Sequence, residues 1–182
     1  HADHIGSIAA GVDTFGCENF IMPEMVSYTR TFENMLSSVE QAGCQTAYGV
    51  AGDTFTLGDA QLKLLWPTEG FDASDPNEIS LVLQVTYGEY SFLLTGDAGN
   101  DAEEGFLSQV QPVTVLKAGH HGSDTSSTEA FLQKAQPEYV VISVGAGNIY
   151  GHPSPAMLER LDENCQVLRT DEKGSIVFTV KE

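Results

Sequence analysis

Residues that bind metal ions are concentrated at the start of the chain, in the segment His1-Ala2-Asp3-His4. The chain has five histidines. The other three stand in two glycine-flanked segments, Ala118-Gly-His120-His121-Gly-Ser123 and Tyr150-Gly-His152-Pro153. Imidazole nitrogens and carboxylate oxygens are the ligands that Zn²⁺ and similar divalent ions take. Because no histidine lies outside these segments, we expect the segments to meet at one metal site.

A further carboxylate, Asp97, follows the apolar run Phe92-Leu-Leu94. A carboxylate there is badly placed for a core, and Gly96 lets the backbone approach another group closely. In one interpretation Asp97 bridges two metal ions, and in the alternative it caps the helix that follows. Two ions about 3.5–4 Å apart generate a hydroxide near neutral pH and stabilise the attacking and leaving oxygens of a hydrolysis.

The composition predicts one domain over residues 1–182, large enough to bury a core. No apolar run is long enough for a transmembrane helix. The net charge of -18 argues against a broad surface for nucleic-acid phosphates, which need Lys and Arg. It still permits a phosphate substrate at a metal centre, and it suits an extracellular or cell-surface protein. The three cysteines lack metal-finger spacing, so we expect free thiols.

The elements that would position these residues follow a layered α/β pattern with mixed sheets. The metal-ligand segments stand at strand ends, where a rigid strand fixes the loop that follows. The strands are expected at 20–22, 47–50, 54–57, 61–66, 79–87, 90–95, 113–116, 139–144, 167–170 and 175–180, the last two as a hairpin around 171–174. The helices are expected at 5–10, from a Thr29 or Thr31 cap to Gly43, and at 101–109, 127–135 and 155–164.

The motifs, in this order and spacing, resemble the metallo-β-lactamase superfamily. Within it they are most similar to the extracellular domain of ComEC-type DNA-uptake proteins and their stand-alone relatives. The resemblance implies a four-layer αββα sandwich with mixed sheets. It rests on His1-Ala-Asp-His-Ile-Gly6, Asn77-Glu-Ile-Ser-Leu-Val-Leu83, Phe92-Leu-Leu-Thr-Gly-Asp97, Val115-Leu-Lys-Ala-Gly-His-His-Gly-Ser123, Ile142-Ser-Val-Gly145 and Tyr150-Gly-His-Pro153.

The family motif is H-x-H-x-D-H, and its last three ligands match the first segment of this chain. Its first histidine would fall two residues before His1, so we expect a sequence truncated at its N-terminus, without the first strands of the fold. The resemblance implies that His1 serves one metal ion and that Asp97 bridges to a second. The second ion is expected to be held by Asp3, His4 and one residue of the pair His120 and His121. His121 is favoured because a small Gly-Ser pair follows it.

Many family enzymes have another histidine before the bridging carboxylate, but this chain has Asn77, Glu78 and Ser80 in that region. The first ion is then poorly liganded, so the site holds either one or two ions, Zn²⁺ or alternatively Mn²⁺. The resemblance places His152 at the pocket edge. There imidazole could bind a substrate phosphoryl oxygen or protonate the leaving oxygen. Asp3 and His152 are the residues expected to act in catalysis.

The resulting hypothesis is a metal-dependent hydrolase, a phosphodiesterase or nuclease that acts on DNA during uptake. Single-stranded DNA or small phosphodiesters fit the acidic surface better than duplex DNA. A membrane channel upstream of the sequence is expected from the resemblance, and no protein partner is evident. Two alternatives stay open: hydrolysis of another ester, lactone or β-lactam, and a catalytically impaired binding domain.

Overall fold

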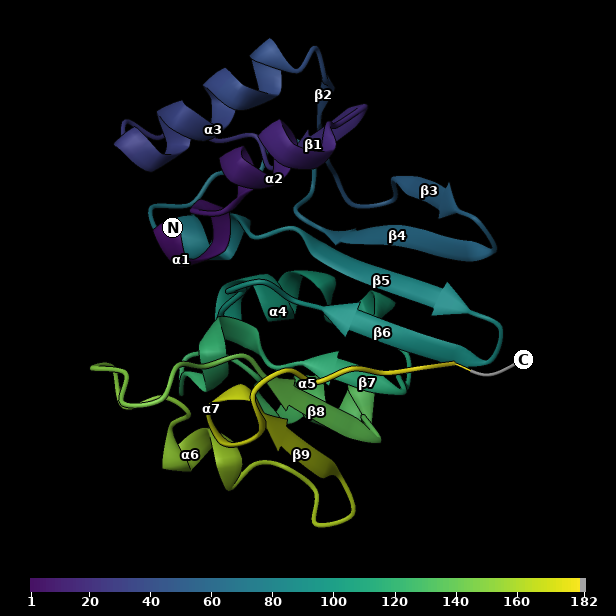
Figure 1. The fold of residues 1–182 in the computed structure, drawn as a ribbon. Helices are drawn as coiled ribbons and strands as arrows, with labels where there is room; N and C mark the ends of the chain where they lie inside the picture. The colour runs from purple at the N-terminus through teal and green to yellow at the C-terminus, as the bar shows by residue number, and fades with distance from the viewer. Residues whose placement is uncertain (181–182) are drawn as a thin grey trace. The chain divides into compact units, whose positions relative to one another are not determined.

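The computed structural model describes residues 1–180, which divide into two compact units, one from His1 to Gly49 and one that begins at Val50 (Figure 1). One domain over residues 1–182 stays a prediction. Within the described residues, no helix combines the length and the apolar character needed to cross a membrane.

The first unit pairs two short strands with three helices. Its elements are α1 (Ala2–Ile5), α2 (Ile8–Phe15), β1 (Asn19–Met22), α3 (Arg30–Gln41) and β2 (Gln45–Tyr48). The strands β1 and β2 are parallel, with Asn19 opposite Gln45. The predicted start of α3 is confirmed at Thr29, whose Oγ1 accepts the Phe32 N–H at 3.4 Å. The apolar stripe of α3 is buried against Met22 and holds the unit together.

The second unit is built on a seven-stranded sheet whose strand order follows the chain (Figure 1). Its strands are β3 (Thr54–Leu57), β4 (Ala60–Trp66), β5 (Val82–Tyr87), β6 (Tyr90–Leu94), β7 (Val115–Lys117), β8 (Tyr139–Ile142) and β9 (Gln166–Arg169). Neighbours from β3 to β6 are antiparallel, and neighbours from β6 to β9 are parallel. The predicted mixed sheet is therefore confirmed, as is the hairpin that turns between Tyr87 and Tyr90.

The helices of this unit are short, and the secondary structure predicted for the last part of the chain is partly wrong. They are α4 (Asn100–Phe106), α5 (Glu129–Ala135), α6 (Pro155–Leu158) and α7 (Thr170–Lys173), with 3₁₀ turns at Pro76–Ile79, Leu107–Gln109 and Gly119–Gly122. The helix expected over 155–164 is thus a single turn. The expected C-terminal hairpin is replaced by α7.

The reason for α7 lies in contacts that form at the end of β9. Arg169 Nη2 pairs with Asp171 Oδ2 at 2.6 Å, which curls the chain into a helical turn. Thr170 Oγ1 accepts the Val144 N–H and donates to the Val144 carbonyl oxygen, both at 2.8 Å. Residues 175–180 have no strand pairing, and Phe178 packs its ring against those of Phe92 and Tyr139.

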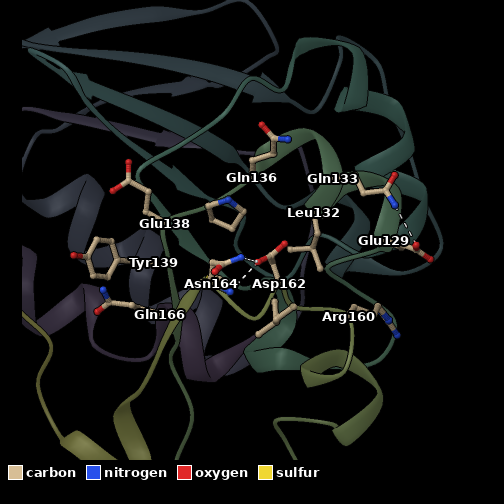
Figure 2. A pocket seen from close by; sticks show the side chains of 13 residues that line it. Glu129, Leu132, Gln133, Gln136, Glu138, Tyr139, Arg160, Asp162, Asn164 and Gln166 are labelled. Atoms are coloured by element: carbon tan, nitrogen blue, oxygen red, sulfur yellow. Dashed lines mark hydrogen bonds between the residues drawn. The ribbon is translucent and has the colours of Figure 1, made fainter.

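A cavity of about 780 Å³ opens at the amino ends of β8 and β9, where Tyr139 and Gln166 line it (Figure 2). Its walls combine polar and apolar side chains, and several of the polar groups hydrogen-bond to one another. Gln133 Nε2 donates to Glu129 Oε1 at 3.1 Å, and the dashed lines of Figure 2 mark this bond and the bonds of Asn164 to Asp162. None of the predicted ligand or catalytic residues lines this cavity.

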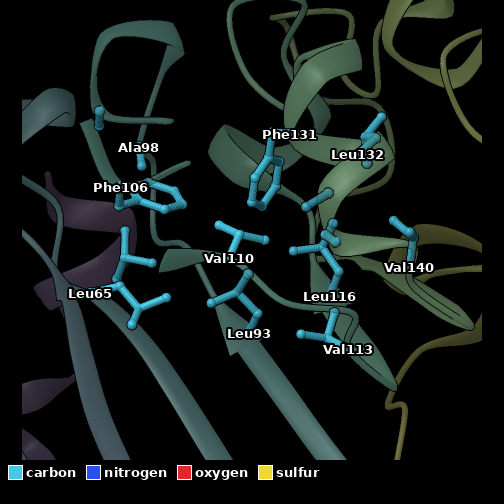
Figure 3. Close-up of a cluster of buried hydrophobic side chains, with 14 of the residues drawn as sticks. Leu65, Leu93, Ala98, Phe106, Val110, Val113, Leu116, Phe131, Leu132 and Val140 are labelled. Atoms are coloured by element: carbon cyan, nitrogen blue, oxygen red, sulfur yellow. The ribbon is translucent and has the colours of Figure 1, made fainter. Parts of the chain in front are cut away.

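The core of the second unit lies between the sheet and helices α4 and α5 (Figure 3). Leu93, Leu116 and Val140 come from three adjacent parallel strands and are at most 1% exposed. They pack with Phe106 and Phe131, whose rings meet edge to face at 5.7 Å. This core fixes the strands whose carboxyl ends carry the functional loops.

Candidate metal centre

Three loops of the second unit begin at the carboxyl ends of β6, β7 and β8. The first carries Asp97, the second His120 and His121, and the third His152. Because β6, β7 and β8 are parallel neighbours, their carboxyl ends meet at one edge of the sheet. The sequence thus delivers its isolated carboxylate and its downstream histidines to one place, as expected from their strand-end positions.

The closest pair among these residues is Asp97 and His121. Asp97 Oδ1 lies 3.5 Å from His121 Nε2, and the aspartate is 4% exposed. The other ring nitrogen, Nδ1, lies 2.7 Å from the carbonyl oxygen of Ser143. A carbonyl only accepts, so Nδ1 donates this bond. In the neutral imidazole the lone pair is then on Nε2, the nitrogen that faces the carboxylate.

This pair fits the donor set of a divalent metal ion. Ligand atoms about 2.0–2.1 Å from a tetrahedral zinc ion lie about 3.3–3.4 Å apart along an edge of the tetrahedron. The observed 3.5 Å separation is close to that value. A histidine whose second nitrogen donates to a backbone carbonyl is also the usual arrangement of a metal ligand. Asp97 and His121 would therefore hold such an ion without a change in their side-chain positions.

The backbone of His120 and His121 has a strained conformation, which sets the direction of both rings. His120 and His121 have φ of 44° and 56°, which residues with a side chain rarely adopt. The loop is held by the His120 N–H, which donates to the Gly96 carbonyl oxygen at 3.2 Å. A Cβ on Gly122 would lie 2.7 Å from Pro153 Cβ, so only glycine fits there. The flanking glycines were the sequence signal of this close packing.

Two residues that sequence reasoning did not place support the loop that carries Asp97. Ser80 Oγ accepts the Asp97 N–H at 3.1 Å, and a Cβ on Gly96 would lie 3.0 Å from Ser80 Cβ. Glu78 Oε2 accepts the Ala102 N–H at 2.7 Å, in the first turn of α4. The segment that has no histidine in this chain, in contrast to the family pattern, therefore positions Asp97 and caps a helix.

His152 lies beside the histidine pair, with its ring centroid 5.8 Å from that of His120. Burial lowers the pKa of His152, and positive charge on His120 and His121 lowers it further. Its Nδ1 is buried and has no hydrogen-bond partner among residues 1–180. Asn148 holds its backbone, since Oδ1 accepts the His152 N–H at 3.0 Å and Nδ2 donates to the His152 carbonyl oxygen at 2.7 Å.

The remaining predicted ligands belong to the first unit. Asp3 and His4 are consecutive residues of the one-turn helix α1, and His1 stands at its N-cap position. All three are exposed. His121 approaches Asp97, and the choice of His121 over His120 stays a prediction together with the complete ligand set.

Known proteins provide a further line of evidence. The model of the family described as "Metallo-beta-lactamase superfamily" matches residues 1–146 of this chain. ComE operon protein 3 of Bacillus subtilis strain 168 is 32% identical over 182 residues, which cover 98% of this chain and 23% of that protein. Competence protein ComA of Neisseria gonorrhoeae is 40% identical over 120 residues, which cover 64% of this chain and 17% of that protein. The chain thus spans less than a quarter of either relative.

A solved structure also shares the fold. The metallo-beta-lactamase fold protein YhfI of Bacillus subtilis superposes with a TM-score of 0.56 at 11% sequence identity. The match covers 93% of this chain and 70% of that one. At this identity the likeness concerns the fold alone, and it agrees with the mixed α/β architecture described above.

Proposed function

The chain belongs to the metallo-β-lactamase superfamily, and on this premise we propose that it is a metal-dependent phosphodiesterase that cleaves DNA strands during uptake. The superfamily is one of metal-dependent hydrolases, and membership supports a hydrolytic reaction. The phosphodiester substrate rests on the motif resemblance and on the relative that is named a competence protein, ComA of Neisseria gonorrhoeae. The proposed location is the extracellular side of a membrane, where incoming DNA arrives.

The observation that carries the proposal is the pair Asp97 and His121. A buried carboxylate oxygen lies 3.5 Å from an imidazole nitrogen whose ring partner donates to a backbone carbonyl oxygen, on two loops that follow parallel strands. By the sequence motif we assign Asp3 and His4 to the same ligand set, with His1 and His120 as further candidates. The expected ion is Zn²⁺ or Mn²⁺, in one or two copies.

The chemistry of such a site divides between the ion and the chain. A bound divalent ion supplies Lewis-acid activation of water and neutralises the charge that develops on phosphate. Asp97 and His121 fix its position, because Ser80 and the Ser143 carbonyl oxygen hold them in place. His152, on the neighbouring loop, contacts the substrate phosphoryl group, either as a hydrogen-bond donor or as the proton source for the leaving oxygen.

The substrate form is set by charge. With 26 acidic and 8 basic residues, the chain offers few groups that can replace the counterions of a duplex. A single strand or a small phosphodiester needs fewer phosphate contacts, and the ion itself provides positive charge at the scissile bond. We therefore propose single-stranded DNA as the substrate.

The test compares wild type, Asp97→Asn and a control, Asp59→Asn, in which an exposed turn carboxylate is changed. Each protein is loaded with Zn²⁺ or Mn²⁺ and dialysed, and bound metal is measured by mass spectrometry. Initial rates are then measured on bis-p-nitrophenyl phosphate and on nitrocefin. We expect phosphodiester hydrolysis and metal retention in wild type and Asp59→Asn, and a loss of both in Asp97→Asn.

Three results would contradict the proposal. An Asp97→Asn protein that keeps its rate removes the mechanism. Hydrolysis of nitrocefin alone moves the substrate to acyl compounds, as in the β-lactam alternative. Less than about one ion per wild-type chain after dialysis favours a binding domain over an enzyme.

A further inference from the structure

The loop that carries His152 contains two exposed apolar residues, which precede the histidine. Tyr150 is 76% exposed and Ile149 is 91% exposed, although most large apolar side chains of this unit are buried. The ring of Tyr150 stacks on that of His152, with centroids 6.0 Å apart and planes 18° from parallel. One face of the tyrosine ring therefore covers His152, and its exposure leaves the other face accessible to solvent.

This loop is rigid for its size. Besides its two bonds to His152, Asn148 Nδ2 donates to the Gly145 carbonyl oxygen at 3.1 Å, which closes the turn. The Ser154 N–H donates to the Gly122 carbonyl oxygen at 2.8 Å and ties the loop to the histidine pair. The tyrosine is thus presented by an ordered turn next to His120 and His152, at little further entropic cost on binding.

The charge of the segment is as informative as its shape. No charged residue lies between Glu138 and Glu159, in a chain whose net charge is -18. Carboxylates on other parts of the chain repel a polyanion, whereas the segment between Glu138 and Glu159 contributes no carboxylate. An exposed aromatic face without charge is what an unpaired nucleobase stacks on, whatever its identity. A base inside a duplex is stacked between its neighbours and offers no free face, so this surface selects single strands.

We propose that Tyr150 is a stacking platform for a nucleobase next to the scissile phosphodiester. The inference rests on the proposed function and specifies its substrate: a single-stranded nucleic acid, with the base on Tyr150 and the neighbouring phosphate toward His152. Tyr150 is a specificity residue for this reaction and takes no part in bond cleavage.

The first measurement is binding, because it does not depend on turnover. Fluorescence anisotropy is recorded with metal-loaded protein for two labelled phosphorothioate oligomers, a thymidine oligomer and an abasic oligomer, which have equal length and charge and resist cleavage. Loss of one stacked base corresponds to about 5- to 150-fold in affinity. We expect the preference of wild type for the thymidine oligomer to fall by this factor in Tyr150→Ala. Tyr150→Phe keeps the ring and should keep the preference.

A matched control is Tyr28→Ala, since Tyr28 is 88% exposed and lies in the first unit. It should behave as wild type in both binding experiments. Equal affinity of wild type for the two oligomers would overturn the inference. So would a Tyr150→Ala protein that keeps the wild-type preference, or a Tyr28→Ala protein that loses it.

The second measurement separates this inference from the proposed function. Thymidine 5′-p-nitrophenyl phosphate and methyl p-nitrophenyl phosphate have the same scissile bond and differ in the nucleoside. Tyr150→Ala should lower the ratio of their kcat/KM values, chiefly through KM of the thymidine compound. If wild type cleaves neither compound but prefers the thymidine oligomer through Tyr150, the hydrolytic proposal fails and the stacking site stands. If wild type cleaves both and the ratio is unchanged in Tyr150→Ala, the stacking site fails alone.

Discussion

Glu103 should contribute more to stability than any other carboxylate of the second unit outside the metal centre. It lies in α4 and is 1% exposed. Its two oxygens accept backbone N–H groups from the segment before α5, that of Ser127 at 2.5 Å and that of Thr128 at 2.8 Å. These bonds hold the chain just after the histidine loop. In Glu103→Ala both donors lose their acceptor while they stay largely buried.

The magnitude follows from those two donors. Each unsatisfied buried N–H costs about 1–3 kcal/mol, and removal of a buried carboxylate returns part of this. We therefore expect Glu103→Ala to lower the free energy of unfolding by about 2–4 kcal/mol. Glu103→Gln retains one acceptor oxygen and should lose about 1–2 kcal/mol. Urea unfolding followed by tryptophan fluorescence measures both, with Glu104→Gln as an exposed neighbouring control.

The pH dependence of the free energy of unfolding tests whether burial dominates the pKa of Glu103. Burial raises the pKa of Glu103 above its usual 4.5, against hydrogen bonds from Thr128 and Ser127 and the charge of Arg160. The folded chain then holds this proton more tightly than the unfolded chain. The associated stability is present below pH 4.5 and is lost as the pH rises through the folded pKa. The deficit of Glu103→Gln should therefore shrink as pH rises, and a deficit that grows would refute the dominance of burial.

Three further substitutions follow from single contacts. Ser80→Ala removes the acceptor of the Asp97 N–H, so metal affinity in chelator competition should fall about 10- to 100-fold; unchanged affinity would show that Asp97 needs no such support. Thr29→Ala removes the cap of α3 and should cost about 1 kcal/mol in urea unfolding, unless water replaces the hydroxyl fully. Phe131→Ala leaves a cavity against Phe106 and should cost about 3–5 kcal/mol, seen as a lower Tm in calorimetry; a loss below about 1 kcal/mol would mean that the core collapses around the gap.

Local patterns predicted most of the secondary structure because neighbouring residues determine them. The alternation in β5 and β6, the glycine between them and the threonine before α3 each act within a few residues. The prediction of a C-terminal hairpin was wrong because contacts between residues distant in the sequence determine this part of the chain. Asp171 looked like a turn residue, but the bonds of Thr170 to Val144, 26 residues away, depend on where β8 and β9 lie.

The residues of the candidate site also differ in whether the sequence could predict them. Residue type and glycine flanks predicted Asp97 and the downstream histidines, because few other roles suit those residues at strand ends. The groups that orient them are a serine hydroxyl, an asparagine and a backbone carbonyl oxygen, from Ser80, Asn148 and Ser143. Their types are common, and only the folded chain brings them to the site.

The order of the strands has a consequence for synthesis. From β4 to β9, every strand lies beside the strand made just before it. A nascent chain can therefore extend the sheet by addition at one growing edge, without a long search for a distant partner. The loops after β6, β7 and β8 join in that order, so the edge that bears Asp97, His121 and His152 is completed only when β8 has docked. We therefore expect Asp97 and His121 to bind a metal ion only after the strands that support them have paired.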